Sequence, residues 1–333
     1  MIIAVDAMGG DYSPREAIKA ALDSVADYPM DIALVGKKPV LEMLLRKQKD
    51  KGRISIVDAS EVVEDNEDAI QAVQNKPDSS VAVAARMIKE GKAAGFVSVG
   101  STGASVVAAF LNLPMVPGIE RGALCAIFET NQIKPCCIID CGVNPNCQPL
   151  FLVQFAQIAT IFAERVLDIH SPRVGLLNNG EEEKKGNSLT KETHQRLKVM
   201  EEINFIGNIE PFDILRGKAD IVVMDGFTGN VLIKTIEGYS EIVENLLAMG
   251  EIAKVDQYLT GSALVQYTEL AATVKRLDYK EVGGAVLLGL EGNVVIGHGR
   301  SRAKAIKNCI VLCYQAANRN VIETIKTANY ATE

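Results

Sequence analysis

Residues 95–119 read GFVSVGSTGASVVAAFLNLPMVPGI and contain no charged side chain. By length alone such a run is long enough to span a bilayer. However, Gly100, Ser101 and Pro114 interrupt it, and the small and hydroxyl residues around position 100 fall between two apolar segments. We therefore interpret the run as a buried strand, a loop and an apolar helix, which together are the repeating unit of an α/β protein.

The same unit recurs along the chain. Apolar runs without strict alternation predict strands that are buried on both faces, and helical patterns lie between them. The expected strands are residues 2–5, 32–35, 54–58, 95–99, 136–140, 173–177, 221–224 and 294–296. The expected helices include residues 15–25, 38–46, 80–90, 150–166, 191–203, 230–249 and 301–317. Right-handed crossovers between such elements predict a three-layer α/β/α fold with a mainly parallel sheet.

The chain shows no repeat, low-complexity tract or Pro-rich linker, so we expect residues 1–333 to form a single α/β/α domain. The stretch from about 238 to 272 differs from the rest because it is helical and apolar with no strand. It predicts a helical excursion that projects from the sheet.

Composition limits the class of protein. The net charge of −7 argues against nucleic acid as a partner, because binding to a phosphate backbone needs a basic face. The N-terminal run MIIAVD lacks a basic leader and a cleavage site, so we expect a strand and not a signal peptide. Seven cysteines without a regular framework fit a reducing cytoplasm better than secretion.

Small and polar residues follow most of the expected strands, where open parallel sheets bind their ligands. Any one of these loops could be an ordinary turn, since Gly, Asn and Asp are frequent turn formers. Their accumulation predicts that they meet at one edge of the sheet and form a cleft for an anion. The candidate residues are Asp6, Gly9, Gly10, Asp11, Ser101, Thr102, Gly103, Asn144, Lys185, Asp225, Asn230 and His298.

Two of these loops resemble anion cradles. Residues 100–103 combine glycines and hydroxyls at the start of a helix, and Gly9 and Gly10 allow close approach of backbone N–H groups. Ser13 and Glu16 have the spacing of a capping box for the helix that follows the first loop. Neither a nucleotide P-loop nor a dinucleotide-binding fingerprint is present.

Other catalytic classes lack support in the sequence. The cysteines near residue 140 match no zinc spacing, and the three histidines are far apart. No Gly-x-Ser-x-Gly elbow indicates a Ser-His-Asp triad. We therefore expect catalysis without a metal, a cofactor or a covalent nucleophile.

With these motifs, the sequence resembles the bacterial phosphate acyltransferase family, also called acyl-ACP:phosphate transacylases. The likeness extends from residue 6 to about residue 310. The motifs that carry it are DAMGGD (6–11), DSS (78–80), G-x-TGA (100–104), PRVGLL (172–177), GEE (180–182), KGN (185–187), DGF-x-GN (225–230), LDY (277–279) and HG (298–299).

The resemblance implies a fold similar to the isocitrate/isopropylmalate dehydrogenase group and a homodimer. It also implies transfer of a fatty acyl group from acyl-ACP to inorganic phosphate, giving acyl phosphate for phosphatidic acid synthesis. The family's catalytic Lys and Asn fall on Lys185 and Asn230. A membrane glycerol-3-phosphate acyltransferase is the implied downstream partner. The protein is then cytoplasmic, with at most weak peripheral contact at the inner face of the plasma membrane.

Under this resemblance, the excursion at 238–272 is a candidate for an acyl groove wall, a weak membrane contact or a dimer interface. Two alternatives to the main reading stay open. The first is a short-chain phosphotransacylase that uses CoA thioesters, which would need no acidic carrier protein. A basic patch that could bind an acidic carrier would distinguish the two, and it could be formed by Arg300, Arg302, Lys304 and Lys307. A weakly active scaffold that binds acyl-ACP is the second, because Gln74 and Ser101 replace an Arg and an Asn usual in the family.

Overall fold

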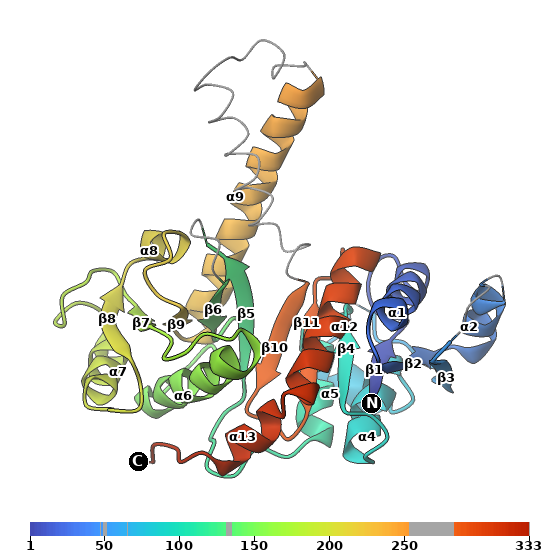
Figure 1. Ribbon diagram of the computed structural model, residues 1–333, viewed down its shortest axis with the longest axis horizontal. Helices are drawn as coiled ribbons and strands as arrows, with labels where there is room; N and C mark the ends of the chain where they lie inside the picture. The colour runs from blue at the N-terminus through green and yellow to red at the C-terminus, as the bar shows by residue number, and fades with distance from the viewer. Residues whose placement is uncertain (47, 49–51, 65, 131–134, 253–282, 333) are drawn as a thin grey trace.

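The computed structural model describes residues 1–46, 48, 52–64, 66–130, 135–252 and 283–332. Within these residues, the strands form one sheet of 11 strands with helices on both faces (Figure 1). Across the sheet the strands are β3 (Ile54–Asp58), β2 (Asp31–Gly36), β1 (Ile2–Asp6), β4 (Gly95–Ser98), β11 (Asn293–Gly297), β10 (Gly284–Leu288), β5 (Ala123–Glu129), β6 (Pro135–Ile139), β9 (Ile221–Val223), β7 (Val174–Leu177) and β8 (Phe205–Ile209).

The predicted three-layer α/β/α architecture is confirmed, as are the eight predicted strands. Strands β5, β8 and β10 were not predicted. The helices are α1 (Arg15–Asp27), α2 (Lys38–Leu45), α3 (Ala69–Asn75), α4 (Ser80–Lys89), α5 (Thr102–Asn112), α6 (Pro149–Val166), α7 (Ser188–Lys198), α8 (Pro211–Leu215), α9 (Gly226–Ile252), α12 (Ala303–Asn318) and α13 (Val321–Thr327). None of these helices combines the length and the apolar character needed to cross a bilayer.

The sheet changes direction at its centre. Strands β3, β2, β1, β4 and β11 are parallel to one another, and so are β6, β9, β7 and β8. Between these two groups, β10 and β5 form three successive antiparallel pairings. Two of these pairings follow from chain length, because β5 and β6, and likewise β10 and β11, are separated by too few residues for the crossover that parallel strands need.

The prediction that all candidate loops meet at one edge is therefore wrong. An odd number of antiparallel pairings separates β11 from β6, so the two groups of strands point in opposite directions. The loops after β1, β4 and β11 lie at one edge, and those after β6, β7 and β9 lie at the other. Any common site has to be formed across the face of the central strands.

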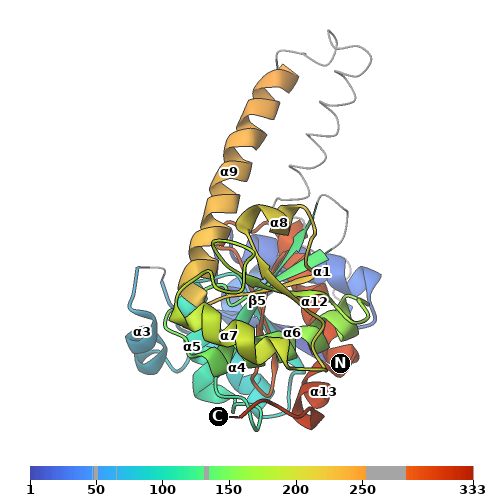
Figure 2. The same ribbon diagram turned by 90° about the vertical axis from the view of Figure 1, so that its left-hand side faces the viewer.

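Two apolar layers hold the helices on the sheet. On one face α6 and α12 pack on the strands, with Leu152, Phe155 and Phe162 of α6 fully buried. On the other face α4, α5 and the beginning of α9 contribute Ala84, Ala108 and Ile233 (Figure 2). Small side chains on α4 and α5 let these helices approach the sheet closely. This second face is the one that carries the candidate site.

Helix α9 is the long element that projects from the body of the molecule (Figures 1 and 2). The predicted helical excursion at 238–272 is thus confirmed up to Ile252, and the remainder of that range lies outside the described residues. Phe227, Tyr239, Ile242 and Leu246 are exposed on this helix.

The capping box predicted for α1 is wrong. Pro14 occupies the N-cap position of α1 and makes no side-chain cap, while the hydroxyl of Ser13 donates a hydrogen bond to the carbonyl of Gly9. The carboxylate of Glu16 instead accepts a hydrogen bond of 2.7 Å from the backbone N–H of Ala303, at the start of α12. Glu16 therefore joins two helices and does not close its own.

Candidate active site

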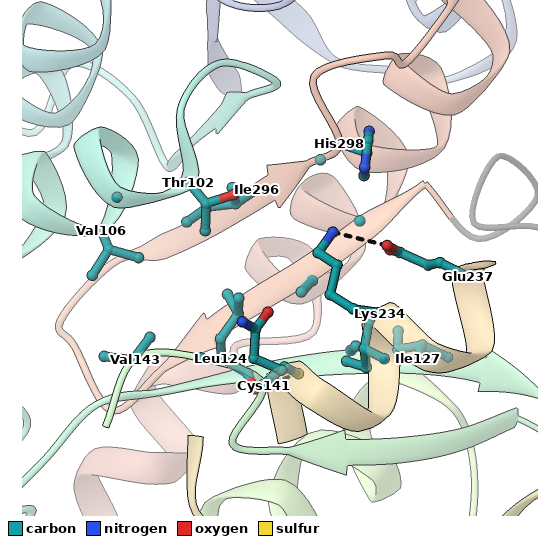
Figure 3. Close-up of a pocket in the computed structure, with 18 of the residues that line it drawn as sticks. Thr102, Val106, Leu124, Ile127, Cys141, Val143, Lys234, Glu237, Ile296 and His298 are labelled. Carbon is teal, nitrogen blue, oxygen red and sulfur yellow. Dashed lines mark hydrogen bonds and ion pairs between the residues drawn. The ribbon is translucent and has the colours of Figure 1, made fainter. Parts of the chain in front are cut away.

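A cavity of about 500 Å³ lies over the face of β5 and β10, between α5 and α9 (Figure 3). This volume is within the range of small-molecule sites. The cavity is where the two oppositely directed halves of the sheet meet, so it receives residues from both edges. Its lining residues are Thr102, Gly103, Val106, Val107, Leu124, Ala126, Ile127, Phe128, Cys141, Gly142, Val143, Asn230, Ile233, Lys234, Glu237, Gly283, Gly284, Ala285, Ile296, Gly297 and His298.

The floor and one wall of this cavity are apolar. Leu124, Ala126 and Phe128 alternate along β5 and so point to the same face of the sheet. Val106 and Val107 extend the apolar surface from α5. Each methylene group buried on such a surface contributes about 0.8 kcal/mol to binding, so the cavity favours an alkyl chain.

Polar side chains gather at another part of the same cavity. Asn230, Lys234 and Glu237 follow one another at helical spacing on α9 and therefore share one face of that helix. The ammonium group of Lys234 lies 2.8 Å from the carboxylate of Glu237, and His298 stands close to this ion pair (Figure 3). Thr102 lines the cavity from the start of α5. The site is thus an apolar pocket with a polar, hydrogen-bonding end.

His298 is half-buried at this polar end. Its Nδ1 accepts a hydrogen bond of 3.2 Å from the backbone N–H of Arg300, so the neutral ring carries its proton on Nε2. Burial lowers the pKa of His298 below its usual 6.5, although Glu237 and Asp11 act in the opposite direction. The ring is therefore a neutral hydrogen-bond donor at physiological pH.

Asp140 organises the loop after β6, against which the first turn of α9 packs. One carboxylate oxygen accepts hydrogen bonds from the N–H groups of Leu124, Gly142 and Val143, and the other accepts two from Asn144. The amide of Asn144 also donates to the carbonyl of Gly122. Asn144, a predicted binding residue, is therefore used within the loop and does not line the cavity.

The first turn of α9 packs tightly on this loop. Asp225 accepts hydrogen bonds from the backbone N–H of Thr228 at 2.9 Å and from its hydroxyl at 2.7 Å, and so caps the helix. A Cβ atom on Gly229 would collide with the carbonyl group of Asp140. This close approach places Asn230 against the backbone of Gly142. Of the predicted pair in this segment, Asn230 lines the cavity and Asp225 acts as a helix cap.

At the opposite edge, the loops after β1 and β4 cross at close range. Asp6 accepts hydrogen bonds from the N–H of Gly9 at 3.0 Å and from the hydroxyl of Ser98 at 2.8 Å. A Cβ atom on Gly9 would lie 2.8 Å from the backbone nitrogen of Gly100, so only glycine fits there. Asp6, Gly9 and Ser101 line a second, much smaller cavity.

The remaining predicted residues of this edge divide between the two cavities and the loops. Thr102 and Gly103 line the large cavity, whereas the hydroxyl of Ser101 accepts a hydrogen bond from the N–H of Ala104 and caps α5. Gly10 and Asp11 pack against Gly299, to whose carbonyl Asp11 donates its backbone N–H. They hold the loop that carries His298 and line neither cavity.

Lys185 lies in the loop after β7, and its side chain is exposed. Its backbone carbonyl accepts a hydrogen bond of 3.2 Å from the amide of Asn178, and its aliphatic stem packs over Gly180. It is absent from the lining of the large cavity. The structure thus brings together Thr102, Asn230 and His298, and the catalytic pairing of Lys185 with Asn230 remains a prediction.

Sequence reasoning missed Lys234 and Glu237. Their spacing of four and seven residues from Asn230 would have placed them on the same helical face, but they lie inside an expected helix and not in a loop. It also missed the apolar floor, since β5 and β10 were not predicted. Among the described residues, no group of three or more His, Cys, Asp and Glu side chains could hold a metal ion.

Residues 1–324 match a protein family described as fatty acid synthesis protein. This chain belongs to that family. Curated relatives named phosphate acyltransferase cover nearly the whole chain. The protein from Dehalococcoides mccartyi is 45% identical over 98% of this chain and 93% of its own. The protein from Dictyoglomus thermophilum is 43% identical over 97% of both chains, and that from Heliobacterium modesticaldum is 41% identical over 98% of this chain and 97% of its own.

Solved structures share the fold at much lower identity. A phosphotransacetylase from Streptococcus pyogenes matches with a TM-score of 0.61 and 18% identity, covering 96% of this chain and 94% of that one. A 4-hydroxythreonine-4-phosphate dehydrogenase from Salmonella typhimurium matches with a TM-score of 0.56 and 11% identity, covering 94% and 98%. At these identities the likeness shows a shared fold.

Proposed function

We propose that this protein is a phosphate acyltransferase, which transfers a fatty acyl group to inorganic phosphate and yields acyl phosphate for phosphatidic acid synthesis. The observation that carries the proposal is the large cavity, in which an apolar floor on β5 meets the polar side chains of Asn230, Lys234 and His298. An alkyl chain and a phosphate group are the two chemical parts that such a cavity would accommodate. Membership of the family and the names of its relatives support the same reaction.

The reaction needs little covalent chemistry from the protein. An oxygen of hydrogen phosphate attacks the thioester carbonyl carbon, the C–S bond breaks, and the phosphate proton ends on the departing sulfur. Phosphate is a hydrated and weak nucleophile, so positioning supplies much of the rate, up to about 7–11 kcal/mol of the barrier. A side chain that donates a hydrogen bond to the developing oxyanion adds roughly 10²–10³-fold.

Residue roles follow from these needs. Asn230 donates a hydrogen bond to the carbonyl oxygen as negative charge develops there, and Lys185 compensates the charge of phosphate or oxyanion. Thr102 and the N–H groups at the start of α5 hold phosphate from the facing wall. The Gly9–Asp11 and Asn144 loops act at a distance, because their hydrogen bonds fix the elements that carry the lining residues.

The acyl donor in this proposal is acyl-ACP. Arg300, Arg302 and Lys304 are exposed and begin two residues after His298, at the cavity. Arg302 is held in place because its guanidinium stacks 4.0 Å from the ring of Tyr12. A cationic surface beside His298 would attract an acidic carrier protein and raise its association rate.

The deciding experiment mixes purified protein with phosphate and either palmitoyl-ACP or a CoA thioester, and measures acyl phosphate. Formation from palmitoyl-ACP supports the proposal. Formation only from short-chain acyl-CoA would favour a CoA-dependent phosphotransacylase, and binding of acyl-ACP without product would favour a scaffold. Lys185→Ala and Asn230→Ala are each expected to lower kcat at least about 100-fold. Folded variants with near-parental rates would contradict these roles.

We also propose that two copies of the chain associate. Phe227, Tyr239, Ile242 and Leu246 lie within about one third of the circumference of α9 and are exposed. Exposed apolar stripes of this kind are covered in most stable proteins. Sedimentation equilibrium of the wild type and of Ile242→Glu tests this: a dimer that dissociates in the variant supports it, and a monomeric wild type contradicts it.

A further inference from the structure

Among the described residues, Lys234 is the only lysine or arginine that lines the large cavity. It lies one helical turn after Asn230 on the same face of α9. Lys185, the cation expected from the resemblance, lies in an exposed loop and does not contribute to this lining. Lys234 is thus the cation that lies nearest to Asn230 along α9 in the cavity wall, and the roles proposed above do not include it.

Glu237 holds this cation toward the cavity. Its carboxylate lies 2.8 Å from the ammonium group of Lys234, and Glu237 is only 21% exposed, against 57% for Lys234. Both residues line the cavity, so the ion pair lies at its solvent-exposed wall, where a dissolved anion can reach the ammonium group (Figure 3). An ammonium group has three N–H donors and can therefore bind Glu237 and a second anion together.

A dianionic substrate in this cavity needs a positive partner. The carboxylate of Glu237 would repel phosphate, and His298 is neutral because burial lowers its pKa. The N–H groups at the start of α5 carry only partial positive charge. Lys234 offers a full charge within one turn of Asn230, about 5–6 Å between Cβ atoms, so that an anion bound there is close to the amide.

From this geometry we propose that Lys234 binds the phosphate that attacks the acyl group, and that Glu237 is a positioning residue that holds Lys234 in the orientation for doing so. The inference rests on the proposed function and adds to it the residue that recognises phosphate. It predicts an effect on phosphate alone, because the acyl chain is bound by the apolar floor.

The test compares Lys234→Met with Lys234→Arg in steady-state acyl phosphate formation. Lys234→Met keeps the length of the side chain and removes the charge, and we expect the KM for phosphate to rise about 10–100-fold, the effect of losing one charged hydrogen bond. The KM for the acyl donor is expected to change less than about twofold. Lys234→Arg restores most of the phosphate affinity. Lys191→Met, an exposed lysine on α7, is the matched control and leaves both constants unchanged.

Glu237→Gln separates positioning from binding. This variant keeps Lys234 charged but weakens its anchor, and we expect the KM for phosphate to rise only a fewfold with the acyl KM unchanged. Phosphate binding is also measured without turnover, from the ³¹P line width of inorganic phosphate with wild type and with Lys234→Met. Line broadening that is lost in Lys234→Met supports the inference.

An unchanged KM for phosphate and unchanged broadening in a folded Lys234→Met variant would overturn it, as would a rise in phosphate KM confined to Lys185→Met. A wild-type protein that forms no acyl phosphate but broadens the phosphate signal through Lys234 would instead contradict the proposed reaction. The failure of each proposal is therefore recognised separately.

Discussion

Gly229→Ala is the substitution that best tests how α9 is positioned. In an exposed helix interior, replacement of glycine by alanine stabilises a protein by about 1 kcal/mol. At Gly229 the added Cβ would collide with the backbone carbonyl of Asp140, and a backbone atom cannot rotate away as a side chain can. The first turn of α9 would have to shift by on the order of 1 Å, because the interior is close-packed.

Overpacking of this kind costs about 1–3 kcal/mol, which outweighs the gain in helix propensity. We therefore expect Gly229→Ala to lower the free energy of unfolding by up to about 2 kcal/mol. Because Asn230 is the next residue, the shift also displaces its amide, and a misplacement of about 1 Å can cost about 100-fold in rate. The expected result is a large loss of kcat with a small loss of stability.

Gly238 provides the matched control on the same helix. In a single copy of the chain a Cβ atom there would meet nothing within 4 Å, so Gly238→Ala is expected to be stabilising by up to about 1 kcal/mol and to keep its activity. Urea denaturation and steady-state acyl phosphate formation are measured for both variants. If Gly229→Ala proves as stable and as active as Gly238→Ala, the packing of α9 on the Asp140 loop does not position Asn230.

Three further outcomes are expected. Val106→Phe puts a ring into the apolar part of the cavity. It should lower kcat/KM for a palmitoyl donor at least about tenfold and leave kcat/KM for a short-chain donor unchanged. Equal losses for both donors would argue against an acyl chain at this wall. Burial lowers the pKa of His298, so the unfolded chain binds the proton more tightly and the free energy of unfolding falls as the pH drops through 6.5. An NMR titration midpoint of His298 at or above 6.5 would contradict this, as would a His298→Gln variant that loses stability below pH 6.5 to the same extent as the wild type. Burial raises the pKa of Cys147 to about 12, and it also raises the pKa values of Cys136, Cys141, Cys309 and Cys313. These thiols should therefore react with a thiol reagent at pH 8 far more slowly in the native protein than in guanidinium, and equal rates would contradict this.

Much of the fold could be predicted from the sequence because buried parallel strands are continuous apolar runs. The runs at β1, β4 and β6 are of this kind and were located within a residue or two. Strand β8 was missed because FIGNI contains glycine and asparagine, which are depleted in strands. The reversal of the sheet could not be foreseen, since it depends on recognising β5 and β10 as partners of short hairpins.

The site was predicted in part for a similar reason. Thr102, Asn230 and His298 were identified because polar residues at strand ends frequently bind ligands, and they do line the cavity. Asp6, Asn144 and Asp225 carry the same signal, but their polar atoms are used within the protein. Asp6 and Asp225 accept hydrogen bonds from nearby backbone N–H groups, and the amide of Asn144 donates to the carbonyl of Gly122, before β5. Composition and spacing do not distinguish a carboxylate that binds a substrate from one that closes a turn.

The reversal at β5 and β10 has a mechanical consequence. Each half of the sheet carries its own helices, and the two halves meet along these central strands and, on one face, where α6 packs against α12 and α13. α5 and α9 stand on the other face, on either side of this seam, so a small change in twist along it alters the distance between them. Within the part of the chain that the structure describes, the width of the cavity is thus set by the twist of the sheet at β5 and β10, and not by a loop that covers it.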